Sequence, residues 1–291
     1  TRGLGMTQRV GIFGYPLGHS MSPALQQAAL DEYALDALYE AWPTPPDRLA
    51  EAVAGLREPG CYGANVTVPH KEAVMGMLDR LDQQAEAIGA VNTIVTESGG
   101  KLAGYNTDIY GFLASLSSEA GFDPAGKRVV MLGAGGAAKA AAFALVEGNV
   151  ASLDIANRTV ARAEALIAEL SSNGAETSAF AIDSTGLADR CANADLIVNC
   201  TSIGMRGSPS PDASPLLDGA IQPGCLVYDI VYNPEVTPLL AQAEEAGART
   251  LGGLPMLVYQ GAAAFEKWTG MSAPVEVMMA AARRAMEEQT R

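Results

Sequence analysis

A short glycine-rich turn constrains the fold of this chain more than any other feature. Residues 129–149, VVMLGAGGAAKAAAFALVEGN, carry a G-x-G-x-x-A pattern at Gly133, Gly135 and Ala138, directly after an apolar strand and at the start of an alanine-rich helix. In this setting the first glycine allows a tight turn, the second lets a pyrophosphate approach the backbone, and the helix N-terminus offers unpaired N–H groups. A turn without a ligand is the alternative, but the flanking strand and helix favour a dinucleotide site formed by Gly133, Ala134, Gly135, Gly136 and Ala137.

The residues after the next strand indicate which dinucleotide fits. The strand SLDIA, 152–156, runs into Asn157-Arg158-Thr159, and Arg162 follows one turn into the next helix. An acid at this strand end usually holds a ribose 2′-hydroxyl, whereas a 2′-phosphate needs cations; Asp154 lies three residues too early for the first role. Arginine in a first helical turn opposes the helix dipole, so an anionic partner is preferred over a solvated helix start. We therefore expect NADP, bound by Asn157, Arg158, Thr159 and Arg162.

The rest of the chain alternates between strand-like and helix-like segments, and at 291 residues it is long enough for two domains. In the first series, expected strands at 9–13, 37–42 and 61–66 alternate with helices at 23–33 and 47–56, and a hairpin follows at 92–95 and 101–105. The second series has expected strands at 128–132, 152–156, 196–200, 226–231 and 249–251, with a weak extra strand near 177–181.

The last two expected helices, 256–268 and 273–288, have no strand to follow, so they should return to the first domain. The sequence thus predicts an α/β substrate domain at 1–107, a Rossmann-like, doubly wound NADP domain at 108–252, and C-terminal helices at 253–291 that rejoin the first. A cleft between the two domains is expected to close on ligand.

Composition excludes several classes of function. A net charge of -14 disfavours a nucleic-acid partner, and no apolar stretch reaches the ~20 residues that span a bilayer. The four cysteines show no C-x-x-C and no paired spacing with histidine, so we expect no metal site and a cytoplasmic location. The N-terminal TRGLGMTQR lacks the apolar core of a signal peptide, and Met6 is a candidate start.

The segment GANVTVPHK, 63–71, combines a β-like run with a proline that ends it and fixes the direction of Lys71. A lysine after a proline is usually solvated, but in a cleft it can serve as an acid or base. His70 is expected to pack rather than react, because consecutive residues in a turn rarely face one site.

Ser20 and Ser22 flank Met21 and could direct two hydroxyls toward a carboxylate; the alternative is a helix N-cap at Ser22 before Pro23.

Together with the dinucleotide turn, several segments resemble the shikimate dehydrogenase family over nearly the whole chain. They are GYPLGHSMSP (14–23), GANVTVPHK (63–71), GAVNT (89–93), GYNTD (104–108), NRT (157–159), NCTSIGM (199–205) and YDIVYNPEVTP with GGLPMLVYQGAAAFEKWTG (228–238 and 252–270). The resemblance implies NADP-dependent reduction of 3-dehydroshikimate to shikimate, with Lys71 and Asp108 as the catalytic pair. The substrate residues it implies are Ser20, Ser22, Asn65, Thr67, Asn92, Tyr232 and Gln260, and further cofactor contacts are Thr201, Gly253 and Met256.

Two alternatives stay open at this point. A paralogue that acts on quinate or an aminated shikimate would share these motifs, although serine at both 20 and 22 favours shikimate. A non-catalytic nucleotide-sensing module is the other, and the intact Lys71 and Asp108 argue against it. One departure from the family pattern, Gln26-Gln27 in place of a common His-Asn pair, affects the expected packing of the first helix. Oligomeric state, monomer or homodimer, is not readable.

Overall fold

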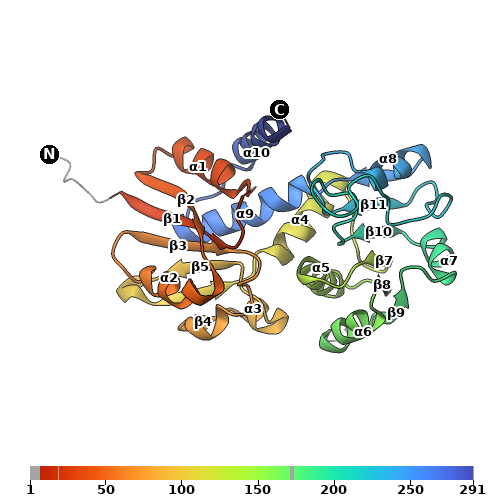
Figure 1. Cartoon of the computed structure of the whole chain (residues 1–291), viewed down its shortest axis with the longest axis horizontal. Coiled ribbons are helices and arrows are strands. Elements are labelled where there is room, and N and C mark those ends of the chain that lie inside the picture. Colours follow the sequence, from red (N-terminus) through yellow and green to blue (C-terminus); the bar gives the residue numbers. More distant parts are fainter. Residues whose placement is uncertain (1–6, 19, 171–173, 291) are drawn as a thin grey trace. The chain divides into compact units, whose positions relative to one another are not determined.

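The computed structural model describes residues 7–18, 20–170 and 174–290, so the candidate start Met6 and His19 lie outside the described residues. The chain divides into two compact units (Figure 1). Unit 1 comprises the residues up to Thr107 and those from Val258, and unit 2 comprises Asp108–Leu257. The first boundary falls where the sequence placed it, after residue 107, whereas the chain returns to unit 1 at Val258 rather than at 253, inside a helix.

Unit 1 is built on a six-stranded mixed sheet in the order β2-β1-β3-β5-β6-β4. Its strands are β1 (Gln8–Gly14), β2 (Ala37–Pro43), β3 (Cys61–Val66), β4 (Arg80–Leu81), β5 (Thr93–Thr96) and β6 (Leu102–Tyr105). Strands β1, β2 and β3 run parallel, as expected of βαβ units, and β5 and β6 form the predicted hairpin. The joining turn of the hairpin is a 3-10 turn, η3 (Ser98–Gly100), whose two glycines adopt positive φ.

The helices of unit 1 are α1 (Ser22–Glu32), α2 (Leu49–Gly55), α3 (Gln83–Ile88), α9 (Leu254–Thr269), which begins in unit 2, and α10 (Val275–Thr290). Short 3-10 turns lie at η1 (Pro46–Arg48) and η2 (Met75–Met77). Helix α10 packs against α1, and Trp268 of α9 donates a hydrogen bond to the Ile94 carbonyl at 2.9 Å. These contacts confirm that the C-terminal helices return to the first unit.

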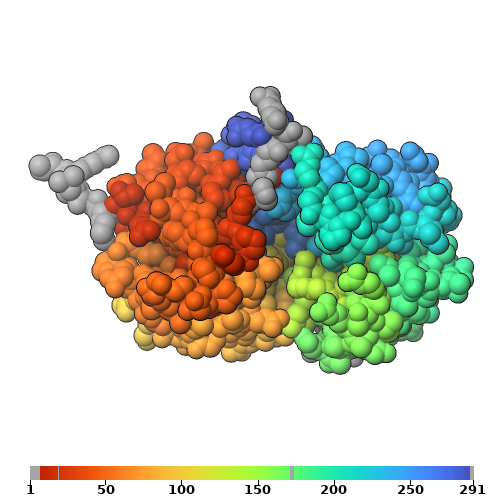
Figure 2. All heavy atoms as spheres, viewed as in Figure 1, coloured from red at the N-terminus to blue at the C-terminus, as the bar shows by residue number. Residues whose placement is uncertain are grey.

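Unit 2 carries a six-stranded parallel sheet in the order β12-β11-β10-β7-β8-β9, the doubly wound arrangement of a Rossmann fold. The strands are β7 (Arg128–Leu132), β8 (Ser152–Asn157), β9 (Glu176–Ala181), β10 (Leu196–Asn199), β11 (Leu226–Asp229) and β12 (Arg249–Leu251). The helices are α4 (Asp108–Ala120), α5 (Gly136–Glu147), α6 (Val160–Glu169), α7 (Gly186–Ala192) and α8 (Pro238–Glu245). Most of the 200–225 segment is exposed and forms part of the surface seen in Figure 2.

Sequence and structure differ in a few elements. Strands β10 and β11 end at Asn199 and Asp229, before the predicted ends at 200 and 231, because side chains of these two residues already bond to the following loop. Strand β4, helix α3 and helix α4 were not predicted. Among the described residues no helix is long and apolar enough to cross a bilayer, and no group of His, Cys, Asp or Glu is placed to hold a metal ion.

Candidate functional site

The glycine turn lies at the point where the strand order of unit 2 reverses, between β7 and β10. Gly133 has φ +107°, and a Cβ there would come within 3.0 Å of the Cys200 backbone, so only glycine fits the close approach of the two strand ends. A Cβ at Gly135 or Gly136 would meet no atom within 4 Å. The backbone is therefore uncovered on the side from which a pyrophosphate would approach.

Helix α5 begins directly after this turn and has no acidic residue in its first turn. The helix itself thus supplies no carboxylate to its own N-terminal N–H groups and positive dipole end. Ala138, the third position of the motif, is completely buried, which brings the helix close to the sheet. These features fit the pyrophosphate of a dinucleotide, and the backbone of Gly133, Ala134, Gly135, Gly136 and Ala137 stays the predicted site for it.

The segment after β8 has the charge that a 2′-phosphate requires. Arg158 and Arg162 are both exposed, and neither forms an ion pair with any residue that the structure describes. Asn157 Nδ2 donates to the Thr159 carbonyl at 2.8 Å and so shapes the turn that carries Arg158. Asp154 is held by Arg190, whose Nη1 lies 3.1 and 3.0 Å from its two oxygens, and by the Ser178 hydroxyl. The prediction that Asp154 points elsewhere is confirmed.

Two further predicted cofactor residues lie at the same edge of the sheet. The Thr201 hydroxyl donates to Asn199 Oδ1 at 2.7 Å and accepts from Ile203 N at 3.2 Å, so its hydrogen is already used within the loop. Gly253 N donates to the Val231 carbonyl, and a Cβ on Gly253 would lie 2.1 Å from the Ile230 oxygen. Thr201 and Gly253 therefore shape this edge through their own bonds and close packing.

Tyr232 and Met256 also belong to unit 2, where both are half-buried. Tyr232 follows β11, and Met256 lies in the first turn of α9. Tyr232 was predicted to bind the substrate. The other predicted substrate residues lie in unit 1, whereas Tyr232 lies in unit 2.

The predicted substrate residues of unit 1 include members of a buried polar cluster. Ser22 and Asn65 are each only 5% exposed, and Tyr39 joins them: its hydroxyl donates to Asn65 Oδ1 at 2.8 Å and is hydrogen-bonded to Ser22. Burial raises the pKa of Tyr39 well above its ordinary value, although the bond from Ser22 opposes that shift, so the phenol stays neutral and can donate. Asn65 Nδ2 donates in turn to the Asn92 carbonyl and to Thr93 Oγ1, each at 3.2 Å.

The cluster continues through Asn92, which is 3% exposed. Asn92 Oδ1 accepts from Thr107 N at 2.8 Å and from Thr93 Oγ1 at 3.0 Å, and Asn92 Nδ2 reaches Thr107 Oγ1 at 2.9 Å and Gln260 Oε1 at 3.5 Å. Buried polar side chains that satisfy one another are rigid and specify one arrangement. The structure therefore brings Ser22, Asn65, Asn92 and Gln260 together as one connected set.

Three members of this cluster were not predicted: Tyr39, Thr93 and Thr107. Thr93 and Thr107 end or nearly end the quoted motifs GAVNT and GYNTD, so their position gave a signal. Tyr39 gave none, because it lies in the edge strand ALYEAWP, whose sequence carries no motif.

The serine loop departs from the capping interpretation. Helix α1 begins at Ser22, and Met21, at the N-cap position, makes no side-chain capping bond. The Ser22 N–H donates a hydrogen bond to Ser20 Oγ at 3.3 Å. The alternative of an N-cap at Ser22 is therefore not what the structure has: Ser20 stabilises the first turn, and the Ser22 hydroxyl bonds to Tyr39.

Lys71 follows β3 and is half-buried in unit 1, close in sequence to the exposed Val68 and Pro69. His70 is buried, and its Nε2 lies 2.7 Å from the Thr44 carbonyl, to which it donates. The expectation that His70 packs is confirmed. Thr67 is half-buried and its N–H bonds to the Phe13 carbonyl. Asp108 directly follows Thr107 of the cluster and begins α4.

The Gln26-Gln27 pair, the departure from the family pattern, is accommodated in α1. Gln26 is 1% exposed and its Nε2 donates to the Gly261 carbonyl of α9 at 2.8 Å. Its Oε1 has no hydrogen-bond partner among the described residues. Gln27 Oε1 accepts from Tyr39 N at 2.9 Å, and its Nε2 donates to Asp31 Oδ1 at 2.9 Å. The pair thus fixes α1 to α9 and to β2.

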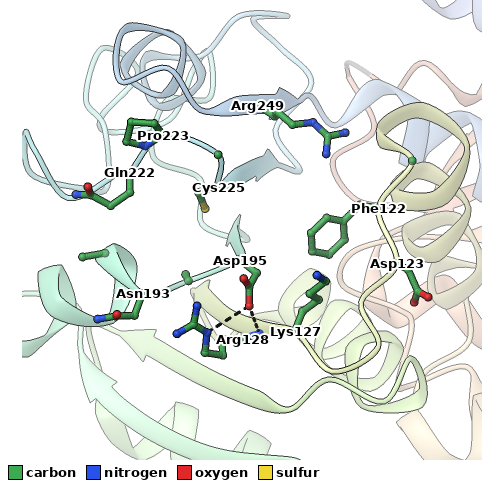
Figure 3. A pocket seen from close by; sticks show the side chains of 14 residues that line it. Phe122, Asp123, Lys127, Arg128, Asn193, Asp195, Gln222, Pro223, Cys225 and Arg249 are labelled. Atoms are coloured by element: carbon green, nitrogen blue, oxygen red, sulfur yellow. Dashed lines mark hydrogen bonds and ion pairs between the residues drawn. The ribbon is translucent and has the colours of Figure 1, made fainter.

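A hollow of about 660 Å³ lies at the opposite, amino edge of the unit 2 sheet (Figure 3). Asp195, which precedes β10, binds Arg128 there through both the backbone N–H at 2.8 Å and Nε at 3.3 Å. Arg249 donates to the carbonyl of Ala120, the last residue of α4. Arg128 thus pairs with a carboxylate and Arg249 caps a helix C-terminus, which explains these two arginines without a ligand.

Comparison with known proteins finds matches over most of the chain. Residues 12–94 match the shikimate dehydrogenase substrate binding domain, 116–246 match the shikimate / quinate 5-dehydrogenase family, and 253–283 match the shikimate 5'-dehydrogenase C-terminal domain. An enzyme of Methanopyrus kandleri named shikimate dehydrogenase (NADP(+)) is 49% identical over 94% of this chain and 93% of its own length.

Solved structures are similar over almost the full chain as well. Shikimate 5-dehydrogenase from Thermus thermophilus, in complex with NADP(H) and shikimate, is 38% identical with a TM-score of 0.84, over 96% of this chain and 99% of its own. A 5-ketofructose reductase of Gluconobacter is 36% identical with a TM-score of 0.86, over 96% and 99%. Together with these relatives, the two α/β units define the class of NADP-linked alcohol oxidoreductases. The chain belongs to the shikimate dehydrogenase family.

Proposed function

We propose that this chain is an NADP(H)-dependent shikimate dehydrogenase, which reduces the C3 ketone of 3-dehydroshikimate to shikimate and catalyses the reverse oxidation. The observation that carries the proposal is the connected buried cluster of unit 1, in a chain of this family. A small ring with a carboxylate and several hydroxyls is recognised by many directed hydrogen bonds, and a cluster of hydroxyls and amides supplies them without a strong positive charge.

The residues divide the work as follows. Ser20 and Ser22 bind the carboxylate, while Asn65, Thr67, Asn92 and Gln260 bind the ring hydroxyls. When bound, NADPH supplies the hydride to C3, and the electron pair of the C=O double bond moves onto the oxygen. Lys71 Nζ gives that oxygen its proton, and in the oxidation it takes the proton back. Asp108 holds a substrate hydroxyl and orients Lys71, and Tyr232 contacts the bound substrate.

The cofactor site follows from the edge described in unit 2. The backbone of Gly133, Ala134, Gly135, Gly136 and Ala137 holds the pyrophosphate, and Asn157, Arg158, Thr159 and Arg162 hold the 2′-phosphate. Thr201, Gly253 and Met256 form the nicotinamide end. Because Lys71 lies in unit 1 and the glycine turn in unit 2, the reaction requires the expected cleft to close. Small-angle scattering with and without both ligands tests that closure.

Steady-state kinetics test the function. We expect shikimate with NADP to give a higher kcat/KM than quinate with NADP, and NADP a higher value than NAD. One similar structure is named a 5-ketofructose reductase. We therefore also test 5-ketofructose with NADPH, as a candidate substrate that has no carboxylate. Equal or better turnover of quinate would identify the paralogue. A folded protein that binds NADP and turns over none of these substrates would be a nucleotide-sensing module.

Location and assembly belong to the same proposal. All four cysteines, at 61, 191, 200 and 225, are free, which suits the reducing cytoplasm. The protein acts there as a monomer or homodimer, and light scattering after gel filtration decides between the two.

A further inference from the structure

Asp229, the last residue of β11, is a carboxylate buried within unit 2 with 0% exposure. Its Oδ1 accepts hydrogen bonds from Asn199 Nδ2 at 2.9 Å and Val231 N at 3.0 Å, and its Oδ2 accepts one from Thr237 Oγ1 at 2.6 Å. All three donors are neutral, and no cation among the described residues pairs with it. Burial raises the pKa of Asp229 to about 6, although the three hydrogen bonds oppose the shift.

The direction of this shift decides what the carboxylate does for stability. Since the pKa in the folded protein lies above the ordinary value of 3.8, the stabilising contribution of this carboxyl is complete below about pH 3.8 and is lost as the pH rises through about 6. At pH 7.5 the ionised group therefore costs stability. An asparagine of the same shape would accept the bonds from Asn199 and Val231 without that cost, so stability alone does not explain an aspartate here.

The position of Asp229 relative to a dinucleotide follows from the order of the strands. The pyrophosphate site follows β7, and the predicted 2′-phosphate site at Arg158 follows β8, on one side of the reversal in strand order. A dinucleotide crosses that point, so its other half extends over the carboxyl ends of β10 and β11. Asp229 is the end of β11. The nicotinamide ring in that half carries a positive charge when oxidised and none when reduced.

The surrounding bonds hold the carboxylate and that edge together. Asn199, which donates to Asp229, also accepts from Thr201 N at 3.0 Å, and Val231 accepts from Gly253 N at 3.2 Å. Thr237 is the N-cap of α8, where its Oγ1 also accepts from Leu240 N. Asp229 therefore cannot turn away without releasing both segments that carry predicted cofactor residues, and its charge stays fixed at the edge.

We propose that Asp229 is a residue that sets cofactor selectivity: its fixed negative charge favours binding of oxidised NADP⁺ over NADPH at the carboxyl edge of the unit 2 sheet. The inference rests on the proposed function only in that the ligand is a nicotinamide dinucleotide. Asp229 does not touch the reacting atoms. It acts through the electric field at the site, whose strength falls with distance and with the effective dielectric constant.

The test removes the charge and keeps the shape. Dissociation constants are measured without shikimate, for NADPH by its fluorescence and for NADP⁺ by calorimetry, at pH 7.5. Asp229→Asn should weaken NADP⁺ binding roughly 3- to 30-fold, the order of magnitude expected when one charge acts on another through a protein interior, and change NADPH binding less than twofold. Its thermal midpoint should not fall. Asp195→Asn, at the amino edge of the same sheet, removes the same net charge and should alter neither constant.

Equal weakening of both cofactors, or no change in either, would overturn the proposal and leave Asp229 a structural residue. If Asp229→Asn does not fold, the wild-type protein decides: the ratio of NADPH to NADP⁺ dissociation constants should fall several-fold between pH 7.5 and pH 5, as Asp229 is protonated. The 2′-phosphate also titrates near pH 6 but is common to both cofactors and cancels. Among the described residues, the Cys200 thiol is a titratable group close enough to interact with Asp229; burial and Asp229 both raise its pKa, so it stays neutral.

A ratio that does not change with pH would contradict the proposal. The outcome is separate from that of the proposed function, because binding is read without substrate. Selective loss of NADP⁺ affinity in a protein that does not turn over shikimate would support the role of Asp229 and refute the dehydrogenase.

Discussion

Unit 1 buries a connected set of polar side chains, whereas unit 2 leaves the backbone uncovered at Gly135 and Gly136 and two arginines exposed. The cluster of unit 1 has its hydrogen bonds in place among its own residues, from Ser22 through Tyr39 and Asn65. A rigid set of this kind suits a small ring that must be held in one orientation. An open turn at a helix N-terminus suits a phosphate group.

The difference predicts how each unit responds to substitution. In unit 1 the functional side chains are also structural, so a change there affects chemistry or packing. In unit 2 the predicted pyrophosphate site is backbone, so the way to disturb that site is to cover it, whereas the exposed arginines can be tested by removing them. The predictions that follow test this contrast, from the largest expected effect to the smallest.

The largest effect is expected at Lys71 of unit 1. Lys71→Ala should lower kcat by ~10²–10⁴, the usual range for a positioned acid or base, with little change in KM for shikimate and none in cofactor affinity. Asp108→Asn should also lower kcat and could raise KM. Both variants are measured across pH 6 to 10, with circular dichroism as the control for folding. A folded Lys71→Ala enzyme with near-normal kcat would move the proton transfer to Asp108 or to water.

In unit 2 the next largest effect is expected from covering the turn. Gly135 has φ −97°, which any residue adopts, and open space where a Cβ would stand, so Gly135→Val should fold. It should raise KM for NADP by roughly tenfold or more, because the side chain fills the space of the pyrophosphate. Gly133→Ala is the matched control: its φ of +107° and the 3.0 Å approach to Cys200 predict a lower thermal midpoint. A Gly135→Val variant with unchanged KM would show that the pyrophosphate lies elsewhere.

Arg158 tests the exposed charge of the same unit. If it binds a 2′-phosphate, Arg158→Ala should raise KM for NADP by an order of magnitude or more, since charge-assisted hydrogen bonds contribute roughly 1.5–3 kcal/mol. NAD kinetics should barely change. Because the side chain is exposed, stability should be unaffected. An equal loss with both cofactors would make Arg158 a structural residue.

The same contrast explains what could be predicted from the sequence. The dinucleotide edge was readable because its signal is local: strand, glycine turn and helix are continuous, and the structure gives Gly133 and Gly135 the two different environments that the motif implies. The cluster of unit 1 joins α1, β2, β3, the segment before β5 and α9, which no local pattern connects. Its members in the quoted motifs were found through family resemblance, whereas Tyr39 was missed.

Side-chain bonds that compete with the backbone account for other differences. Ser22 looked like an N-cap because serine before proline is a common helix start, yet its hydroxyl bonds to Tyr39, a partner 17 positions away in the sequence. The sequence does not single out Asp229, because an acid at the end of a strand is usually solvated. Only the fold shows that it is buried without a cation.

The smallest effect is expected in α1, where the side-chain amides of the adjacent Gln26 and Gln27 differ in how many of their polar atoms have hydrogen-bond partners. Gln26→Met removes one hydrogen bond, worth about 1 kcal/mol, but also removes the buried Oε1 that has no partner among the described residues. The two terms nearly cancel and methionine conserves volume, so the thermal midpoint should move by no more than about 2–4 °C and KM for shikimate by less than twofold.

Gln27→Met is the matched variant on the same helix. Gln27 is less buried than Gln26, yet its Oε1 accepts from Tyr39 N and its Nε2 donates to Asp31. Methionine at position 27 therefore leaves the Tyr39 N–H unpaired, in the edge strand that carries the Tyr39 phenol. We expect Gln27→Met to lower the thermal midpoint more than Gln26→Met, against the order of burial, because an unpaired donor costs more than a lost bond. The reverse order would show that burial, not hydrogen-bond satisfaction, governs this helix. A tenfold rise in KM for shikimate in Gln26→Met would instead make Gln26 part of the substrate site.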